Sequence, residues 1–188
     1  MKINKRKKET FPISQSPNLP ISRRKARVAI IMGSDSDWTT LEAGAKVLAS
    51  FGVGAEVRVL SAHRSPAQVR QYVAQASRRS IKIFIAGAGG AAHLAGVVAA
   101  HTTQPVIGVP IESGPLRGLD SLLSTVQMPK GVPVATVAIG NAVNAALLAV
   151  QMLAVGDRRL SRKLAAHKRA LTTQTLKADH RLRAKRKG

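Results

Sequence analysis

The central part of the chain alternates between short apolar runs and longer segments in which apolar residues recur every three or four positions. The apolar runs are rich in valine and isoleucine, and they occupy residues 27–32, 55–60, 81–86, 105–110 and 133–139. Continuous runs of this length are typical of strands that are buried on both faces of a parallel sheet. We therefore expect five parallel strands.

The segments between these runs have helical spacing. In residues 39–51, Leu41, Ala45 and Leu48 fall on one stripe. Similar patterns predict helices over residues 66–78, 91–100, 119–126 and 141–153, and a further helix over 157–171 before a polar, basic end. Strands that alternate with helices indicate an α/β protein, here a three-layer αβα sandwich of flavodoxin-like type around a five-stranded parallel sheet.

The net charge of +21 lies mainly at the two ends of the 188-residue chain. Residues 1–27 carry +8 and residues 157–188 carry +10, whereas residues 28–156 carry only +3. We expect a disordered basic extension over 1–25, a catalytic domain over 26–156, and a basic helix and tail over 157–188. The basic ends are suited to non-specific contact with nucleic acid, without that contact being the function.

Composition excludes several classes of chemistry. The chain has no cysteine, so disulfides, thiolate nucleophiles and cysteine-bound zinc are excluded. No apolar run has the length of a signal peptide or a membrane span. These features fit a cytoplasmic enzyme.

In open parallel sheets, ligands bind beyond the carboxyl ends of the strands, so the residues after each strand are candidates for a site. After the first strand, residues 33–38 read GSDSDW. Ser34, Ser36 and the start of a helix favour an anion site, and the Asp37 carboxylate suits ribose hydroxyls. The alternative is that these residues only cap the helix, since serine and aspartate are preferred caps.

After the second strand, residues 59–66 read VLSAHRSP. Ser65, followed by Pro66 and by Gln68, fits a capping box with proline at the first helical position. His63 and Arg64 precede this cap and are not explained by it. Arginine binds phosphate through two parallel hydrogen bonds, and histidine carries protons near neutral pH.

After the third strand, residues 86–94 read AGAGGAAHL. Gly87, Gly89 and Ala92 satisfy the dinucleotide pattern GxGxxA, and Glu112 lies where a ribose-binding acid is expected. A dinucleotide-binding oxidoreductase is therefore an alternative. His93, taken by itself on an alanine-rich helix, is more typical of a packing residue.

Taken together, the motifs MGSDSDW, SAHRSP, AGAGGAAHL, PVIGVP and GLDSLLSTVQMPKGVPVATVAIG resemble the class I N5-carboxyaminoimidazole ribonucleotide mutases of purine biosynthesis, over about residues 26–155. The chain departs from that family at Ala95, where proline is expected. The resemblance implies a flavodoxin-like homo-octameric isomerase of IMP biosynthesis, with sites where subunits meet. It also implies that neither ATP, another cofactor nor a metal is needed.

The resemblance further implies a role for each candidate residue. Ser34, Asp37 and Arg64 bind the mononucleotide substrate, with Asp37 on the ribose and Arg64 on the phosphate. Ser36 and Ser61 are further hydrogen-bonding candidates. His63 is the acid–base residue. The glycine-rich loop 87–90, with Gly87 and Gly89, encloses the aminoimidazole and carbon dioxide together with His93.

Besides the dinucleotide-binding oxidoreductase, two further rival functions differ from the mutase in class or in substrate. An aminoimidazole ribonucleotide carboxylase that uses free carbon dioxide is the nearest enzymatic alternative, although the SAHRSP and GGAAHL loops favour the mutase. A nucleic-acid-binding protein is the other, and it rests on the basic ends of the chain.

Overall fold

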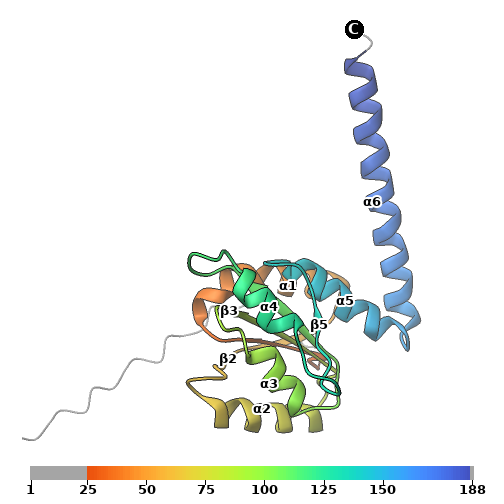
Figure 1. Ribbon diagram of the computed structural model, residues 1–188. Helices are drawn as coiled ribbons and strands as arrows, with labels where there is room; N and C mark the ends of the chain where they lie inside the picture. The colour runs from red at the N-terminus through yellow and green to blue at the C-terminus, as the bar shows by residue number, and fades with distance from the viewer. Residues whose placement is uncertain (1–24, 187–188) are drawn as a thin grey trace, which may run out of the picture.

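The computed structural model describes residues 25–186 and shows one parallel sheet with helices on both faces (Figure 1). The sheet contains β1 (Val28–Met32), β2 (Ala55–Val59), β3 (Ile83–Gly89), β4 (Val106–Ile111) and β5 (Ala135–Thr136). Its strand order is β2-β1-β3-β4-β5 and every pairing is parallel. The predicted three-layer, flavodoxin-like α/β fold with five parallel strands is confirmed.

The helices follow the strands in alternation. They are α1 (Trp38–Phe51), α2 (Pro66–Arg78), α3 (Leu94–Ala100), α4 (Leu119–Val126), α5 (Ala142–Ala154) and α6 (Arg158–Lys185), with a short 3-10 turn, η1, at Asp35–Asp37. No helix within residues 25–186 is both long and apolar enough to cross a lipid bilayer.

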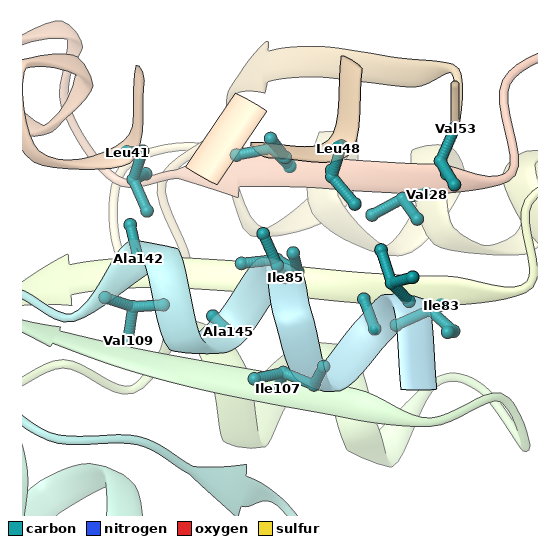
Figure 2. Packing of buried hydrophobic residues seen from close by; sticks show 14 of the residues in the cluster. Val28, Leu41, Leu48, Val53, Ile83, Ile85, Ile107, Val109, Ala142 and Ala145 are labelled. Atoms are coloured by element: carbon teal, nitrogen blue, oxygen red, sulfur yellow. The ribbon is translucent and has the colours of Figure 1, made fainter. Parts of the chain in front are cut away.

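Alternate residues of each central strand face two separate apolar clusters. On one face, Val28 and Ile30 of β1 pack with α1, α5 and the start of α6. Figure 2 shows this cluster, with Ile85 and Ile107 of β3 and β4 beneath α5. On the other face, Ala29 and Ile31 pack against α2 and α3. All five residues of β1 are buried, which explains its unbroken apolar sequence.

The third strand and the following helix differ from the expected bounds. The strand was expected to end at residue 86 but continues to Gly89, and the helix was expected from residue 91 but begins at Leu94. Gly90 and Ala92 have positive φ angles of 60° and 32°. This left-handed backbone is incompatible with a helix, so the turn of helix predicted over 91–93 is absent.

The last strand is much shorter than the run over 133–139 predicts. Only Ala135–Thr136 is regular strand, although Val137 N still donates to the Gly108 carbonyl over 3.1 Å. Prolines border the ladder on both strands, at Pro133 beside β5 and at Pro110 in β4. Because proline has no N–H, each removes one possible ladder bond.

The C-terminal helix is longer than expected. It runs without a break from Arg158 to Lys185, whereas the sequence predicted a helix only to residue 171. Residues 172–185 contain neither proline nor glycine and include several good helix formers. In Figure 1 this part of α6 extends away from the sheet. The expected extension over residues 1–25 falls, apart from its last residue, outside the described residues.

Helix α4 packs closely on β4 through Gly108. A Cβ atom at this position would overlap Thr125 Cγ2 and lie 3.0 Å from Val134 Cγ1. Overpacking of this kind costs about 1–3 kcal/mol. We therefore expect Gly108→Ala to lower the free energy of unfolding by about that amount, measured by urea denaturation. Gly156→Ala is the matched control because no atom lies within 4 Å of its added Cβ. Equal stability of the two variants would contradict this packing.

Candidate functional site

The loops after four strands enclose a cavity of about 490 Å³ at the carboxyl edge of the sheet. Its polar lining contains most of the residues that the sequence singled out. The lining residues are Gly33, Ser34, Ser36, Asp37, Ser61, Ala62, His63, Arg64, Ala88, Gly89, Gly90, Ala92, His93, Leu94 and Ser113. Because parallel strands end at one edge, residues far apart in sequence meet here.

The loop after β1 is organised by an aspartate that sequence reasoning did not select. Asp35 Oδ1 accepts hydrogen bonds from Ser34 Oγ at 3.2 Å and from the Ser36 backbone N–H at 3.0 Å. Ser36 Oγ in turn donates to Ser34 Oγ at 2.9 Å. The hydroxyls of Ser34 and Ser36 therefore lie side by side at the cavity. The alternation of serine and aspartate over residues 34–37 was the sequence feature that could have pointed to Asp35.

Asp37 lies in the same loop, and the pKa of its carboxyl is raised. Its Oδ2 accepts from the Ser34 backbone N–H at 3.0 Å. Burial raises the pKa of the Asp37 carboxyl above 3.8, while hydrogen bonds from the Ser34 and Gly33 backbone and the positive charge of Arg64 oppose that rise. The negative charge of Asp35 adds to it. Asp37 is thus a half-buried acceptor beside the only cation that lines this cavity in the described part of the chain.

Arg64 connects the loops after β1 and β2. The Nη2 atom of Arg64 donates to the Gly33 carbonyl at 2.7 Å, and the Arg64 backbone N–H donates to Ser61 Oγ at 3.1 Å. Ser61 Oγ also lies 3.5 Å from Arg64 Nε. A guanidinium has five N–H donors, so it keeps further donors for an anion after making these bonds.

Ser65 does not act as the sequence predicted. It is the N-cap of α2, with Pro66 at the first helical position, but its side chain makes no cap hydrogen bond, so the predicted capping box with Gln68 is wrong. The Ser65 hydroxyl instead accepts from the Ser61 N–H at 3.0 Å and donates to the Ser61 carbonyl at 3.1 Å. It therefore closes the loop that carries His63.

The two histidines of the cavity form a pair. His63 Nε2 lies 2.7 Å from His93 Nδ1, and the rings meet edge to face at 86° with centroids 4.8 Å apart. One nitrogen donates and the other accepts, so when both rings are neutral they share one tautomer: both carry the proton on Nε2 if His63 donates, and both carry it on Nδ1 if His93 donates. His93, whose sequence context is typical of a packing residue, is exposed and lies at the cavity. The pair can hold a proton at a defined place.

The glycines of β3 and of the turn directly after it divide into two groups. Gly89 and Gly90 line the cavity, whereas Gly87 is buried and does not. A Cβ at Gly87 would lie 2.8 Å from Leu41 Cδ1 and 3.0 Å from Ile111 Cδ1. Core packing thus requires glycine there. The GxGxxA pattern therefore has no exposed first glycine for a dinucleotide, and Glu112 also lies outside the cavity lining, so the dinucleotide interpretation is not supported.

Ser113 lines the cavity from the end of β4 and was not selected by the sequence analysis. The signal was present, because Ser113 follows a predicted strand at the same edge as the other loops. Its position depends on how far the fourth strand reaches, which the sequence pattern placed one residue short.

Residues 27–174 match the family model described as AIR carboxylase. The chain is 58% identical over 143 residues to N5-carboxyaminoimidazole ribonucleotide mutase of Mycobacterium leprae, covering 76% of this chain and 84% of that protein. It is 56% identical to the protein of the same name from Saccharolobus solfataricus, over 73% and 87% of the two chains.

Two further proteins extend the comparison. Phosphoribosylaminoimidazole carboxylase of Ogataea methanolica is 54% identical over 140 residues, which are 74% of this chain and 26% of that protein. The crystal structure of Treponema denticola PurE superposes with a TM-score of 0.78 at 28% identity, covering 84% of this chain and 99% of that chain.

The perturbed carboxyl of Asp37 gives a prediction that carboxyl ¹³C NMR can check. We expect Asp37 to titrate above 3.8, and Arg64→Gln to raise its pKa further because a nearby positive charge is lost. Asp35→Asn should lower the pKa of Asp37. Since the folded-state pKa is raised, the contribution of Asp37 to stability is present below its unfolded pKa and is lost as the pH rises through the folded value. An Asp37 pKa at or below 3.8 would contradict the structure.

Proposed function

Because this chain belongs to the AIR carboxylase family, we propose that the cavity converts N5-carboxyaminoimidazole ribonucleotide into 4-carboxy-5-aminoimidazole ribonucleotide. This makes the protein an isomerase of purine biosynthesis, a carboxylate mutase. The observation that carries the proposal is the pairing of His63 with His93 at 2.7 Å in the cavity that also holds Ser34, Asp37 and Arg64.

The proposed substrate contacts follow the order of the loops. Arg64 binds the phosphate, because its guanidinium keeps free donors after bonding the Gly33 carbonyl. Asp37 accepts from the ribose hydroxyls, and the hydroxyls of Ser34, Ser36 and Ser61 add hydrogen bonds. The backbone at Gly89 and the side chain of His93 enclose the aminoimidazole. Gly87 is left out of this set because Leu41 and Ile111 occupy its side-chain position.

The reaction requires one proton to be given and one to be taken. As the bond between the exocyclic nitrogen and its carboxylate breaks, carbon dioxide forms and the nitrogen accepts a proton. Carbon 4 of the ring then attacks carbon dioxide, and a carbon–carbon bond forms while the proton on carbon 4 is removed. His63 donates the first proton and accepts the second, so it ends in its starting state. Such acid–base catalysis contributes roughly 10²–10⁴-fold.

The pairing with His93 gives His63 a fixed orientation for both transfers. A histidine whose ring nitrogen is hydrogen-bonded holds one tautomer and one ring plane, so the nitrogen that meets the substrate is defined. Carbon dioxide must also remain near carbon 4 between the two steps. The glycine and alanine residues of the β3 loop leave room for the ring and the gas beside the histidines.

A second candidate activity is carboxylation of aminoimidazole ribonucleotide with free carbon dioxide. It is favoured by one observation, the name of the Ogataea methanolica relative, which is a carboxylase. The two activities share the ring chemistry at carbon 4 and differ only in the source of carbon dioxide.

The partners and compartment complete the proposal. We expect a cytoplasmic enzyme, with residues 26–156 as the catalytic domain and with the basic extension and α6 outside it. The basic ends contact nucleic acid only through non-specific charge attraction that plays no part in catalysis. The proposal also includes a homo-oligomer, an octamer by resemblance to the family.

The surface of α4 supports self-association. This helix buries two hydroxyl side chains, Ser121 and Thr125, and both hydrogen-bond to main-chain carbonyls. It exposes an apolar stripe, the α4 stripe, whose members are each about half exposed. The stripe consists of Leu119, Leu123 and Val126 of α4, together with Leu116, which lies three residues before the helix begins. A helix with polar residues inside and leucines outside is suited to contact with another protein surface, and we propose that a second copy of this chain covers it.

Label transfer tests the reaction. Substrate carrying ¹³C in its N5-carboxylate is incubated with the enzyme without ATP, in excess unlabelled bicarbonate. We expect a 4-carboxylated product that retains the ¹³C. Product with unlabelled carboxylate would indicate the carboxylase, and no product would contradict both. His63→Asn should lower kcat by about 10²–10⁴-fold. His101→Asn, an exposed histidine outside the cavity, is the matched control.

Self-association through the α4 stripe is tested by light scattering. We expect the full chain to form a homo-oligomer and the double variant Leu119→Ser, Leu123→Ser to form smaller species with unchanged circular dichroism. The control is Leu176→Ser with Leu182→Ser, which removes two leucines of similar exposure from α6. An unchanged mass for the α4 variant would contradict the role of the stripe.

A further inference from the structure

Ser113 occupies a distinct place among the cavity residues. The loops after β1, β2 and β3 each supply several lining residues, and among the described residues Ser113 alone comes from the segment after β4. The strand order is β2-β1-β3-β4-β5, so β4 lies on the far side of β3 from the loops that carry Arg64 and Asp37. Ser113 therefore stands at the opposite end of the cavity from the proposed phosphate anchor.

The Ser113 side chain packs against the backbone of Gly89. A Cβ added to Gly89 would lie 2.7 Å from Ser113 Oγ and 2.9 Å from Ser113 Cβ. Glycine at residue 89 thus leaves the space that the serine side chain fills. Its hydroxyl is held beside the backbone that forms the cavity floor.

The Ser113 hydroxyl also differs from the other cavity hydroxyls in its hydrogen bonding. Those of Ser34, Ser36 and Ser61 are all engaged in holding their loops together. Within residues 25–186, no group hydrogen-bonds to the Ser113 hydroxyl. A donor that faces a cavity and has no protein partner is available to a ligand.

The carboxylate of the substrate is the group that fits this donor. With the phosphate at Arg64 and the ribose at Asp37, the base extends across β3 toward Ser113. A carboxylate at that end of the cavity has no cation among the described lining residues, so neutral donors must bind it. Glu112, the neighbouring carboxylate, does not line the cavity.

We propose that Ser113 is a substrate-binding residue whose hydroxyl donates a hydrogen bond to the ring carboxylate of 4-carboxy-5-aminoimidazole ribonucleotide. This inference rests on the proposed function, because it takes the nucleotide orientation from Arg64 and Asp37. Ser113 would then recognise the ring carboxylate, whereas Arg64 and Asp37 bind the phosphate and the ribose, which the carboxylated and uncarboxylated nucleotides have in common.

Calorimetric binding of two nucleotides to the full-length protein tests the assignment. Ser113→Ala should weaken binding of 4-carboxy-5-aminoimidazole ribonucleotide by about 10- to 100-fold, the usual effect of losing a hydrogen bond to a charged group. Its affinity for 5-aminoimidazole ribonucleotide, which lacks the carboxylate, should be unchanged. The matched control is Ser36→Ala, which removes another cavity hydroxyl and should affect both nucleotides equally.

The possible outcomes separate this inference from the function on which it rests. Equal loss of affinity for both nucleotides in Ser113→Ala, or no loss for either, would overturn the assignment while the wild-type affinities still support the proposed function. If the wild-type protein binds neither nucleotide, the proposed function fails and the assignment fails with it.

Discussion

Parallel pairing of a strand buried on both faces is the constraint on which the rest of this structure depends. β1 lies between β2 and β3, and each of its residues is buried. Parallel register aligns Met32 with Val59 and with Gly87, so the chain leaves three adjacent strands at one edge of the sheet. Strand pairing alone therefore brings the loops that follow to the same edge of the sheet.

Polar contacts then convert this meeting of loops into a defined cavity. Arg64 reaches from the β2 loop to the Gly33 carbonyl of the β1 loop, and His63 reaches His93 beyond β3. Each contact joins two loops that are about thirty residues apart in sequence. The groups proposed to bind and to react are thus the same groups that hold the loops in place, so a substitution at either residue affects geometry as well as chemistry.

Two surface elements lie outside this arrangement. α4 places leucines outward and hydroxyls inward, an arrangement that suits an outer face in contact with another protein surface. The last part of α6 has the opposite character, because its residues beyond Leu171 are largely exposed and mostly polar or basic. The first surface suits a protein neighbour, whereas the second suits water and anions.

The amino-acid sequence by itself determined the alternation of strands and helices, and it identified most residues of the site. Apolar runs and helical spacing are local properties, so they report correctly on β1 and α1. His63, Arg64 and Asp37 were found because each follows a recognisable strand. Local spacing did not reveal that Gly87 is a packing residue, because Leu41 and Ile111, which require it, come from other elements.

Only the tertiary structure decided the contacts between distant segments. Three features depend on strand order and on the residue at which a strand ends. They are the hydrogen bond between His63 and His93, the packing of Ser113 against Gly89, and the outward-facing leucines of α4. A strand end shifted by one residue moves a side chain to the other face of the sheet, and sequence patterns do not resolve such shifts. Which residues from different strands come into contact is therefore decided by the tertiary structure and not by local sequence patterns.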